Sequence, residues 1–598
     1  MRRTFGWVQN PNVLKTLKNV VASIVVDSEF NKHLRKNKLP LLLKNELILE
    51  EDYKEFMSLL ENPQNGIAYE KLKGKGGERG LNSKGLPNSK CTGITQASIE
   101  AQKTIKLIDT QNNTIEIKKP YSDDWTADGY VRWAISTGLF DYDAKTDLVT
   151  VSALGKTLVE SIEDSDEEKV AFTTALLSYP PANRVLSILS DGKKYTKFEI
   201  GERLGFSGEM GFTSIPQNLF IAELCSTSSP SEKTKIRSNE EGDSDKYART
   251  IARWLEQMGW VITCKKRVNE KYMGINYGED LLAYQITIQG QRALKLSKGY
   301  SSNPRIPKIV YFEMLASKAP DADYLRNKRA KIIQCLNGKK NKTFVEIQTF
   351  LKEQGVDVSC DTIKDDIYGL ERIGLSFDIS ETSVSLNDTI IKLSIPEEKF
   401  ETLEISKMKD IIRTRLHNLN HKYLILVDLA YSDASTKAKK NADAREFEIE
   451  TNSLFTEELN FIGQRLGDSG KPDVIISHGK NGTIIDNKSY KNGFNVDAHC
   501  SDEMTRYILQ NKNRKPGEPS NEWWKSFPDN VTDFTYLFIT SYLKGKFTDN
   551  LQSIHANTGV NGGAIAVNNL LYLAEDMKSG KMPYENFFSM MKNCELSA

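Results

Sequence analysis

Two acidic residues and a lysine in the last quarter of the chain have the types and spacing that phosphodiester chemistry needs. Residues 470–477 carry Pro472 and Asp473 ahead of a β-branched run, and residues 483–489 form a second run that carries Asp486 and Lys488. The Gly- and Asn-rich residues 478–482 between the runs predict a β-hairpin. Because side chains alternate along a strand, Asp486 and Lys488 share one face, and strand pairing brings Asp473 close to Asp486. The pattern predicts two carboxylates and an ammonium group at one place.

That trio suits metal-assisted hydrolysis of a phosphodiester. Aspartate oxygens hold Mg²⁺ and leave positions open for water and a phosphate oxygen. The metal polarises the phosphate and lowers the pKa of the attacking water, while the lysine orients that water or stabilises developing negative charge. An acidic-x-Lys triplet alone is common by chance in a chain with 80 acidic residues, so a surface hairpin with an ordinary ion pair stays an open alternative here.

The elements around this hairpin predict an α/β domain over residues 407–598. Helical patterns cover 407–433, 444–459 and 498–510, and further strand-like runs cover 534–540 and 563–567. Strands that alternate with helices indicate a sheet covered by helices. Length predicts several more domains, because 598 residues correspond to roughly three to five of them.

The first two thirds of the chain show small helical modules with short strands. Residues 130–300 alternate helical patterns with β-like runs at 185–189 and 281–288. Residues 326–392 predict helices over 329–336, 344–354 and 361–373, then a strand pair over 376–379 and 384–386. This order is typical of a winged helix, which binds DNA in many proteins but also serves as a plain packing module. The charged stretch 394–410 has no clear apolar stripe and is interpreted as a linker or exposed helix.

Composition and missing motifs exclude several classes of protein. The net charge of +1 excludes a globally basic nucleic-acid coat, so phosphate binding must come from local patches. Seven scattered cysteines without a C-x-x-C pair indicate an intracellular protein without structural zinc or a disulfide framework. We expect no membrane span, no signal peptide and a cytoplasmic location. A Walker motif and a glycine motif for S-adenosylmethionine are absent, and Tyr179-Pro180-Pro181 lacks the residue order of a DNA methyltransferase, so neither ATP nor S-adenosylmethionine is expected.

Longer stretches of the sequence resemble one known family. They are RTFGWVQN at 3–10, Trp125-x-x-Asp128-Gly129, SYPPA at 178–182, LGFSGE-x-GFTS at 204–214, SDKYAR at 244–249, DEM-x-RY at 502–507 and NEWW at 521–524. Together with Pro472-Asp473 and Asp486-x-Lys488, they resemble the FokI-like type IIS restriction endonucleases, whose nuclease domain carries the PD-(D/E)xK motif.

The resemblance implies a multidomain α+β protein. Its N-terminal part would hold three helix-turn-helix or winged-helix-like DNA-recognition subdomains at 1–155, 156–300 and 301–392. A linker at 393–406 and an α/β restriction-endonuclease-like domain at 407–598 would follow. Asp473, Asp486 and Lys488 match the family's catalytic positions, with Mg²⁺ held by the two aspartates. Glu448 matches a family glutamate that supports the site, although Glu448 can equally be a solvated charge on its helix.

The resemblance also implies a set of DNA contacts. Gln9 and Asn10 lie in a short N-terminal arm that has no core of its own, and their amides can bind adenine edges, although they also suit a turn. Lys246 and Arg249, three apart on one helix face, suit guanine but also suit an ordinary salt-bridged helix, and Trp125 can equally be a core residue. The full set is Gln9, Asn10, Gln102, Trp125, Ser238 (where the family has Asn), Glu241, Lys246 and Arg249.

The function implied is binding to a short asymmetric duplex site of the GGATG type and cutting of both strands at a fixed distance outside it. Cutting both strands would use a transient homodimer of nuclease domains on DNA, formed by a chain that is monomeric in solution. Asp502 and Arg506 match the family's pairing contact, although their i,i+4 spacing also suits a weak intrahelical ion pair. The alternative function is a helix-turn-helix DNA-binding regulator with an inactive nuclease-like domain, which would not need Mg²⁺.

Overall fold

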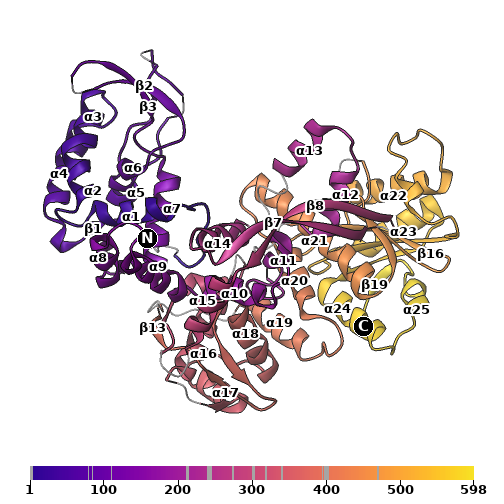
Figure 1. The fold of residues 1–598 in the computed structure, drawn as a ribbon. Coiled ribbons are helices and arrows are strands. Elements are labelled where there is room, and N and C mark those ends of the chain that lie inside the picture. The colour runs from indigo at the N-terminus through magenta and orange to yellow at the C-terminus, as the bar shows by residue number, and fades with distance from the viewer. Residues whose placement is uncertain are drawn as a thin grey trace.

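The computed structural model describes residues 5–78, 80–83, 85–109, 111–209, 215–238, 246–272, 275–299, 304–316, 319–338, 341–393, 395, 403–467 and 470–598. Figure 1 shows the N-terminal parts on the left and below, and the C-terminal domain in orange and yellow on the right. None of the helices in these described ranges is both long and apolar enough to cross a membrane.

The first subdomain is mainly helical and carries a projecting β-hairpin. Its helices pack around buried residues such as Leu17, Phe56 and Trp133. Strands β2 and β3 form the hairpin, whose side chains alternate between exposed and buried or half-buried. The elements are α1 (Leu14–Ser23), α2 (Glu29–His33), η1 (Leu34–Lys38), α3 (Leu39–Lys44), α4 (Glu50–Glu61), η2 (Pro63–Asn65), β1 (Ile67–Ala68), α5 (Tyr69–Lys73), α6 (Ile94–Ser98), β2 (Thr104–Ile108), β3 (Thr114–Lys118), α7 (Asp124–Ser136), β4 (Phe140–Asp143), β5 (Leu148–Val151) and α8 (Ala153–Glu160).

The second subdomain places a long two-stranded ribbon beside several helices. Strands β7 and β8 pair antiparallel over their full length, and Figure 1 shows this ribbon reaching toward the C-terminal domain. The elements are α9 (Asp166–Ser178), α10 (Pro180–Ile188), η3 (Leu189–Asp191), β6 (Tyr195–Thr196), α11 (Lys197–Gly201), α12 (Gln217–Cys225), α13 (Pro230–Ile236), α14 (Lys246–Gln257), β7 (Val261–Tyr272), β8 (Ile275–Ile286) and α15 (Ile288–Lys298).

The β-like run predicted at 185–189 is wrong, because these residues are helical in α10 and η3. Pro180 and Pro181 occupy the first positions of α10, where proline favours helix initiation. Val185, Leu186, Ile188 and Leu189 are all buried and share one wide face of the helix, and such a short run of mostly apolar residues imitates a buried strand. The run at 281–288 is a strand only as far as Ile286, where β8 ends.

The third subdomain has the three helices and the strand pair that the sequence predicts. Helix α17 begins at a capping box in which the Thr343 hydroxyl accepts from the Glu346 N–H and the Glu346 carboxylate accepts from the Thr343 N–H. The elements are β9 (Lys308–Val310), η5 (Phe312–Leu315), α16 (Ala322–Leu336), β10 (Lys342–Thr343), α17 (Phe344–Glu353), α18 (Cys360–Arg372), β11 (Phe377–Ile379), β12 (Ser383–Leu386) and β13 (Ile390–Leu393). One continuous hydrophobic core joins all three N-terminal subdomains.

The C-terminal domain is a six-stranded sheet covered by helices on both faces, in the order β14-β15-β16-β17-β18-β19. The first three strands pair antiparallel, and β16 to β19 run parallel. The elements are α19 (Glu404–Arg413), η6 (His421–Leu424), α20 (Ile425–Ala430), α21 (Lys437–Ser453), η7 (Leu454–Glu458), β14 (Ile462–Arg465), β15 (Val474–His478), β16 (Asn481–Lys488), α22 (Ala498–Asn513), η8 (Trp523–Ser526), β17 (Asp533–Thr540), α23 (Phe547–Thr558), β18 (Gly562–Ala566), α24 (Val567–Lys578), α25 (Tyr584–Ser589) and β19 (Cys594–Leu596).

Alternation along β16 divides this domain into two cores. Ile485 points into the core formed with α19, α20, α21, α24 and α25. Ile484 points into the other core, which α22 and α23 cover. The residues at the end of β16 inherit the same alternation, so Asp486 lies on the α22 side of the sheet.

The single helix predicted over 407–433 is wrong, because the structure breaks it into α19, η6 and α20. The connection between α19 and η6 is bound to α24, where Glu575 accepts the backbone N–H groups of Asn418 and Leu419 at 3.0 and 2.8 Å. A partner distant in sequence therefore replaces the helical hydrogen bonds at the break. Most of the expected linker, at 394 and 396–402, falls outside the described residues.

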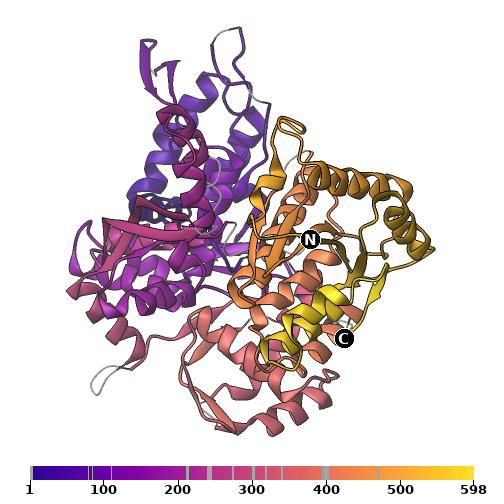
Figure 2. The ribbon, with the colours of Figure 1, turned by 90° about the vertical axis from the view of Figure 1, so that its right-hand side faces the viewer.

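The C-terminal domain packs against the second and third subdomains through polar contacts, and Figure 2 shows it from the side that faces away from the first subdomain in Figure 1. Lys409 of α19 is buried between Asp321 and Asp428, at 2.9 Å from each. Asp365 of α18 contacts Arg413 at 3.2 Å and His421 at 2.6 Å. Buried and partly buried ion pairs thus join the parts, alongside an apolar cluster in which Ile449 of α21 packs with residues of the second subdomain.

Candidate active site and nucleic-acid interface

The predicted hairpin of β15 and β16 is present and brings the acidic residues together. Val474 pairs with Ile485, so Asp473 lies next to the end of β16 that carries Asp486. The backbone N–H of Asn487 donates to Asp473 Oδ2 at 2.7 Å. The Asn487 amide instead donates to Thr451 on α21 at 2.8 Å, on the opposite side from Asp486. The strand register thus places Asp473 and Asp486 side by side.

Lys488 completes the group on the same strand face. Its Nζ lies 2.8 Å from Asp486 Oδ2, and the side chains are only 17% and 6% exposed. Burial alone would lower the pKa of Lys488, but the charge of Asp486 and their hydrogen bond raise it above the usual lysine range. The ammonium group is therefore charged throughout the neutral range.

The environment of the Asp473 carboxyl disfavours its ionised form. Burial raises its pKa well above the usual range, and the charges of Asp486 and Glu448 raise it further. The Asn487 N–H opposes this shift only in part. Two converging carboxylates that repel each other are the donor set that a divalent cation neutralises, so Asp473 and Asp486 fit a hard metal ion.

Sequence reasoning missed one side chain next to this group, Arg465 of β14. Arg465 Nε lies 2.8 Å from Glu448 Oε2, and Glu448 in turn acts on Asp473. Glu448 is therefore an ion-paired residue beside the candidate centre and not a solvated helix charge. The sequence offered no signal for Arg465, because its role depends on β14 pairing with β15 at the edge of the sheet.

Helix α22 covers the Asp486 side and carries the two residues that match the family's pairing contact. Asp502 and Arg506 are both exposed. The alternative, an intrahelical pair between them, is not formed, because Arg506 Nη2 contacts Glu503 Oε1 at 3.3 Å instead. Among the described residues, Asp502 makes no ion pair, so its carboxylate faces solvent.

The first turn of α22 holds a second group of potential metal ligands. One donor atom each of Asp497, His499 and Cys500 lies within 4.8 Å of the others. Asp497 already caps the helix, accepting the Cys500 N–H at 2.9 Å. The sequence marks this Asp-x-His-Cys pattern with no C-x-x-C pair, and in the structure Asp497 and Cys500 lie close enough to Lys488 to interact with its charge.

The N-terminal arm is anchored more firmly than the sequence suggests. Phe5 and Val8 are buried, and Trp7 Nε1 donates to the Met314 carbonyl at 3.3 Å. The Tyr179 hydroxyl accepts the Val8 N–H at 3.2 Å and donates to the Gly6 carbonyl at 2.9 Å. The expectation of an arm without a core is therefore wrong, because its apolar side chains enter the core shared by the three subdomains.

Gln9 and Asn10 follow this anchor at the surface. Gln9 is half-buried, and Asn10 is exposed with a φ of 84°, a left-handed conformation that asparagine tolerates better than most residues. The turn interpretation of Asn10 is thus correct for its backbone, while its exposed amide is still available to a ligand.

Two helices converge on the arm. The Pro11 carbonyl accepts from Trp254 Nε1 of α14 at 2.7 Å, and the Trp7 ring lies 5.3 Å from Tyr247. A Cβ added to Gly129 of α7 would lie 3.2 Å from the Pro11 side chain, so α7 also approaches the arm closely. The structure thereby brings Gln9 and Asn10 near α14, which carries Arg249, and near α7, which carries Trp125.

The remaining expected DNA contacts are scattered or lie outside the described part. Trp125 is 61% exposed, so it is not a core residue. Gln102 and Ser238 are exposed on connections before β2 and after α13. Glu241 and the side chain of Lys246 fall outside the described residues, and Arg249 is half-buried on α14.

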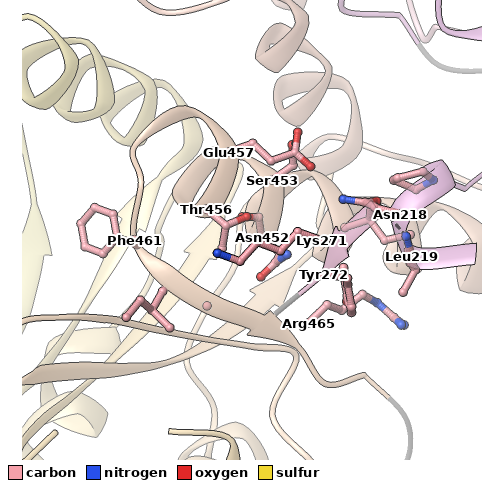
Figure 3. Close-up of a pocket in the computed structure, with 14 residues that line it drawn as sticks. Asn218, Leu219, Lys271, Tyr272, Asn452, Ser453, Thr456, Glu457, Phe461 and Arg465 are labelled. Atoms are coloured by element: carbon pink, nitrogen blue, oxygen red, sulfur yellow. Dashed lines mark hydrogen bonds between the residues drawn. The ribbon is translucent and has the colours of Figure 1, made fainter. Parts of the chain in front are cut away.

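A pocket of about 430 Å³ lies where the β7–β8 ribbon meets the C-terminal domain. Figure 3 shows Tyr272, at the end of β7, lying beside Arg465 of β14. Since Arg465 also binds Glu448 next to Asp473, the ribbon reaches within two side chains of the candidate centre. Burial raises the pKa of Tyr272 to about 12, which keeps its hydroxyl neutral.

Protein-family models match successive parts of the chain from the N-terminal to the C-terminal region. Residues 3–161 match the FokI recognition domain, subdomain 1, and residues 168–302 match subdomain 2. Residues 315–382 match the FokI D3 domain, and residues 402–597 match the FokI cleavage domain.

Individual relatives agree with these family matches. The chain is 33% identical over 605 residues to the type II restriction enzyme FokI of Planomicrobium okeanokoites, covering 100% of this chain and 99% of that one. It is 33% identical over 476 residues to the type II restriction enzyme StsI of Streptococcus sanguinis, covering 77% and 78% of the two chains. Solved structures of FokI and of FokI bound to DNA superpose with TM-scores of 0.83, at 33% and 32% identity over the full length of both chains.

Proposed function

The chain belongs to the FokI family of type II restriction endonucleases, and from that premise we propose that it uses Mg²⁺ to cut both DNA strands at a fixed distance outside a short asymmetric site. Its multidomain α+β fold, with a recognition part and a cleavage domain, is that of this DNA-binding family. The observation that carries the proposal is the convergence of Asp473, Asp486 and Lys488 at the end of the β15–β16 hairpin.

The two aspartates are proposed to hold the metal. Restriction endonucleases of this family use a divalent ion, and Asp473 and Asp486 offer hard oxygen donors whose mutual repulsion a cation relieves. Such an ion supplies Lewis acidity to a phosphate oxygen and makes a bound water more acidic. Asp473 is oriented by the Asn487 N–H, and Asp486 by the rigid strand β16.

Lys488 is proposed to act on the reacting groups directly. Its ammonium group stays charged because Asp486 raises its pKa, so it can hold a hydroxyl nucleophile or stabilise negative charge on the phosphate. Neither role needs Lys488 to lose a proton. The hydrolysis proceeds without a covalent nucleophile from the protein.

DNA recognition is proposed for the surface where the arm, α7 and α14 meet. The exposed amide of Asn10 and the neighbouring Gln9 suit base edges, and Arg249 on α14 suits guanine or a phosphate. Exposed Trp125 lies on α7, which approaches the arm. Gln102, Ser238, Glu241 and Lys246 remain further proposed contacts, and a GGATG-type sequence is the proposed site.

Pairing of two nuclease domains is proposed for cutting the second strand. A single centre cuts one strand, so two copies must meet on DNA, and the isolated chain is expected to be monomeric. Asp502 is free of ion pairs among the described residues, and Arg506 is exposed on the same helix, which supports a reciprocal contact between these two residues across a two-fold axis.

The test is to map the ends of linear duplex DNA on both strands after incubation with the protein, with and without Mg²⁺. We expect discrete Mg²⁺-dependent cuts at a constant offset from one asymmetric sequence, lost in Asp486→Ala but kept in Asp533→Ala. Asp533, the first residue of the neighbouring strand β17, is a matched control because it makes an exposed ion pair with Lys480, 3.0 Å away. Site-specific binding without any cut would overturn the proposal in favour of a DNA-binding regulator.

A further inference from the structure

Glu503 of α22 lies between the candidate centre and the proposed pairing contact. Its Oε1 atom is 3.3 Å from Arg506 Nη2 and accepts the Tyr507 hydroxyl at 3.1 Å. Its Oε2 atom faces Lys488 Nζ at 4.0 Å. The Glu503 side chain is 28% exposed, so this carboxylate depends on its protein partners more than a surface glutamate does.

We propose that Glu503 is a positioning residue that couples Arg506 to Lys488, so that pairing of two nuclease domains changes where the Lys488 ammonium lies. The inference rests on the proposed function, because it needs Lys488 to act in catalysis and Arg506 to act in pairing.

The unpaired chain has Lys488 in a resting position. Lys488 Nζ contacts Asp486 Oδ2 at 2.8 Å, so it occupies an oxygen that a divalent cation would bind. At the same time, the ion pair between Arg506 and Glu503 partly neutralises the Glu503 charge, so Glu503 attracts Lys488 less strongly. The Glu503 carboxylate thus interacts both with Arg506, which is proposed to act in pairing, and with Lys488, which is proposed to act in catalysis.

Pairing would redistribute these contacts. An Arg506 that turns to Asp502 of a second copy shares its guanidinium between the two carboxylates or leaves Glu503, whose other hydrogen-bond donor is the neutral Tyr507 hydroxyl. The nearest cation for this partly buried carboxylate is then Lys488, 4.0 Å away. Lys488 would move toward Glu503 and release Asp486 for the metal, so an unpaired domain would be poorly active.

The chain offers a matched control for the loss of one such carboxylate. Glu518 makes the same i,i+3 kind of ion pair with Lys515, at 2.9 Å, and it is 67% exposed. Glu518→Gln therefore removes an equivalent charge on the protein without touching Lys488. Glu503→Asp keeps the charge with a shorter reach and is expected to restore part of what Glu503→Gln loses.

The first measurement is single-turnover cleavage by the full-length protein over a series of protein concentrations. We expect Glu503→Gln to lower the plateau rate about 10- to 100-fold, as for other residues that orient a ligand or catalytic group. The half-maximal concentration should not rise, since Arg506 is no longer held by the Glu503 charge in the unpaired chain. Arg506→Ala should instead raise that concentration. A Glu503→Gln variant that shifts only the concentration, or that matches Glu518→Gln in both quantities, would overturn the inference.

The second measurement reads metal binding without turnover. Ca²⁺ is titrated calorimetrically into the enzyme on duplex DNA carrying the mapped site, at a concentration where wild-type domains pair. We expect Glu503→Gln to weaken Ca²⁺ binding about 10-fold or more with an unchanged melting temperature. Equal Ca²⁺ affinity in both proteins would overturn the inference.

The two proposals fail in distinguishable ways. Wild-type protein that makes no Mg²⁺-dependent cut would overturn the proposed function and this inference with it. Wild-type cutting that is lost in Asp486→Ala, combined with wild-type behaviour of Glu503→Gln in both measurements, would overturn the inference alone.

Discussion

The candidate nuclease centre takes Asp473, Asp486 and Lys488 from two strands joined by a tight turn, whereas the candidate recognition surface takes its residues from an arm and two helices far apart in the sequence. The centre is largely buried and held by backbone register. The recognition surface is exposed, with Asn10 and Trp125 open to solvent. Charges that must act at fixed distances are built on neighbouring strands, while groups that must meet DNA are assembled only by the packing of whole elements.

The largest expected effect is on the cleavage rate, when a residue of the candidate nuclease centre is replaced. Asp473→Ala should lower the cleavage rate about 10³-fold or more, because a metal ligand and the charge that complements it are lost. Site binding should be unchanged, since Asp473 lies in the cleavage domain and not on the recognition surface. Single-turnover cleavage and a DNA-binding titration without metal measure both quantities, with Asp533→Ala as the control. Parallel loss of binding would mean that the two regions are not separable.

The next effect tests the recognition surface in the same way. Arg249→Ala should cost about 1–3 kcal/mol of site-specific binding, the usual value of a base contact by arginine. The cutting rate at saturating DNA should stay at the wild-type level. Binding to the mapped site and to a scrambled duplex gives the specific part of the loss, and Arg292→Ala, at an exposed position of α15, is the control. Unchanged specific binding would remove Arg249 from the recognition surface.

A third, smaller effect is expected on the pH dependence of stability, at Glu450 of α21. Burial, with help from the charges of Glu457 and Glu202, raises the pKa of Glu450 on α21 to about 7, although Lys422 opposes the shift. A raised folded-state pKa means that the folded protein binds the proton more tightly than the unfolded chain. The stability that this provides is present below about pH 4.5 and is lost as the pH rises through 7.

Glu450→Gln removes this dependence. The variant should be more stable than the wild type at pH 8, by at most about 2 kcal/mol, and the difference should shrink toward pH 5. Thermal unfolding at the two pH values measures it, with the exposed Glu518→Gln as the control. A constant difference at both pH values would show that Glu450 does not titrate in this interface.

The smallest expected effect concerns stability at the recognition surface. Trp125→Ala should change the free energy of unfolding by no more than about 0.5 kcal/mol, because the indole is exposed. Trp133→Ala on the same helix is the contrast, since its ring is fully buried and stacks 4.4 Å from Trp254, and it should cost about 3–5 kcal/mol. Similar losses for both variants would place Trp125 in the core after all.

Local patterns predicted the elements that carry the centre. The turn residues at 478–482 and the period-two alternation sufficed for the β15–β16 hairpin and for the shared face of Asp486 and Lys488. The helices and strand pair of the third subdomain were predicted for the same reason, since caps and periodicity lie within each segment. The family resemblance of the sequence extended this to the whole architecture, which the family and structure comparisons confirm.

Predictions failed where distant parts of the chain decide the local structure. The short apolar run at 185–189 looked like a strand because so few residues do not distinguish a helix from a buried strand, and packing into the shared core decides between them. The helix over 407–433 is broken by Glu575, whose contribution no window of local sequence contains. The arm looked coreless because the residues that bind it, Tyr179 and Met314, follow it by more than a hundred positions.

The sequence by itself determined the identity and spacing of the catalytic candidates, the order of the domains and the membership of the family. The hairpin that carries the catalytic candidates follows from strand alternation and turn chemistry, which act over a few residues, whereas the domain order and the family follow from the resemblance of the longer motifs to one known family. Only the tertiary structure decided that Arg465 supports Glu448, that Glu503 lies between Lys488 and Arg506, and that the arm meets α7 and α14. These arrangements depend on which charged and apolar groups the packed elements bring within contact distance. The separation of two residues along the sequence does not determine their distance in the folded protein.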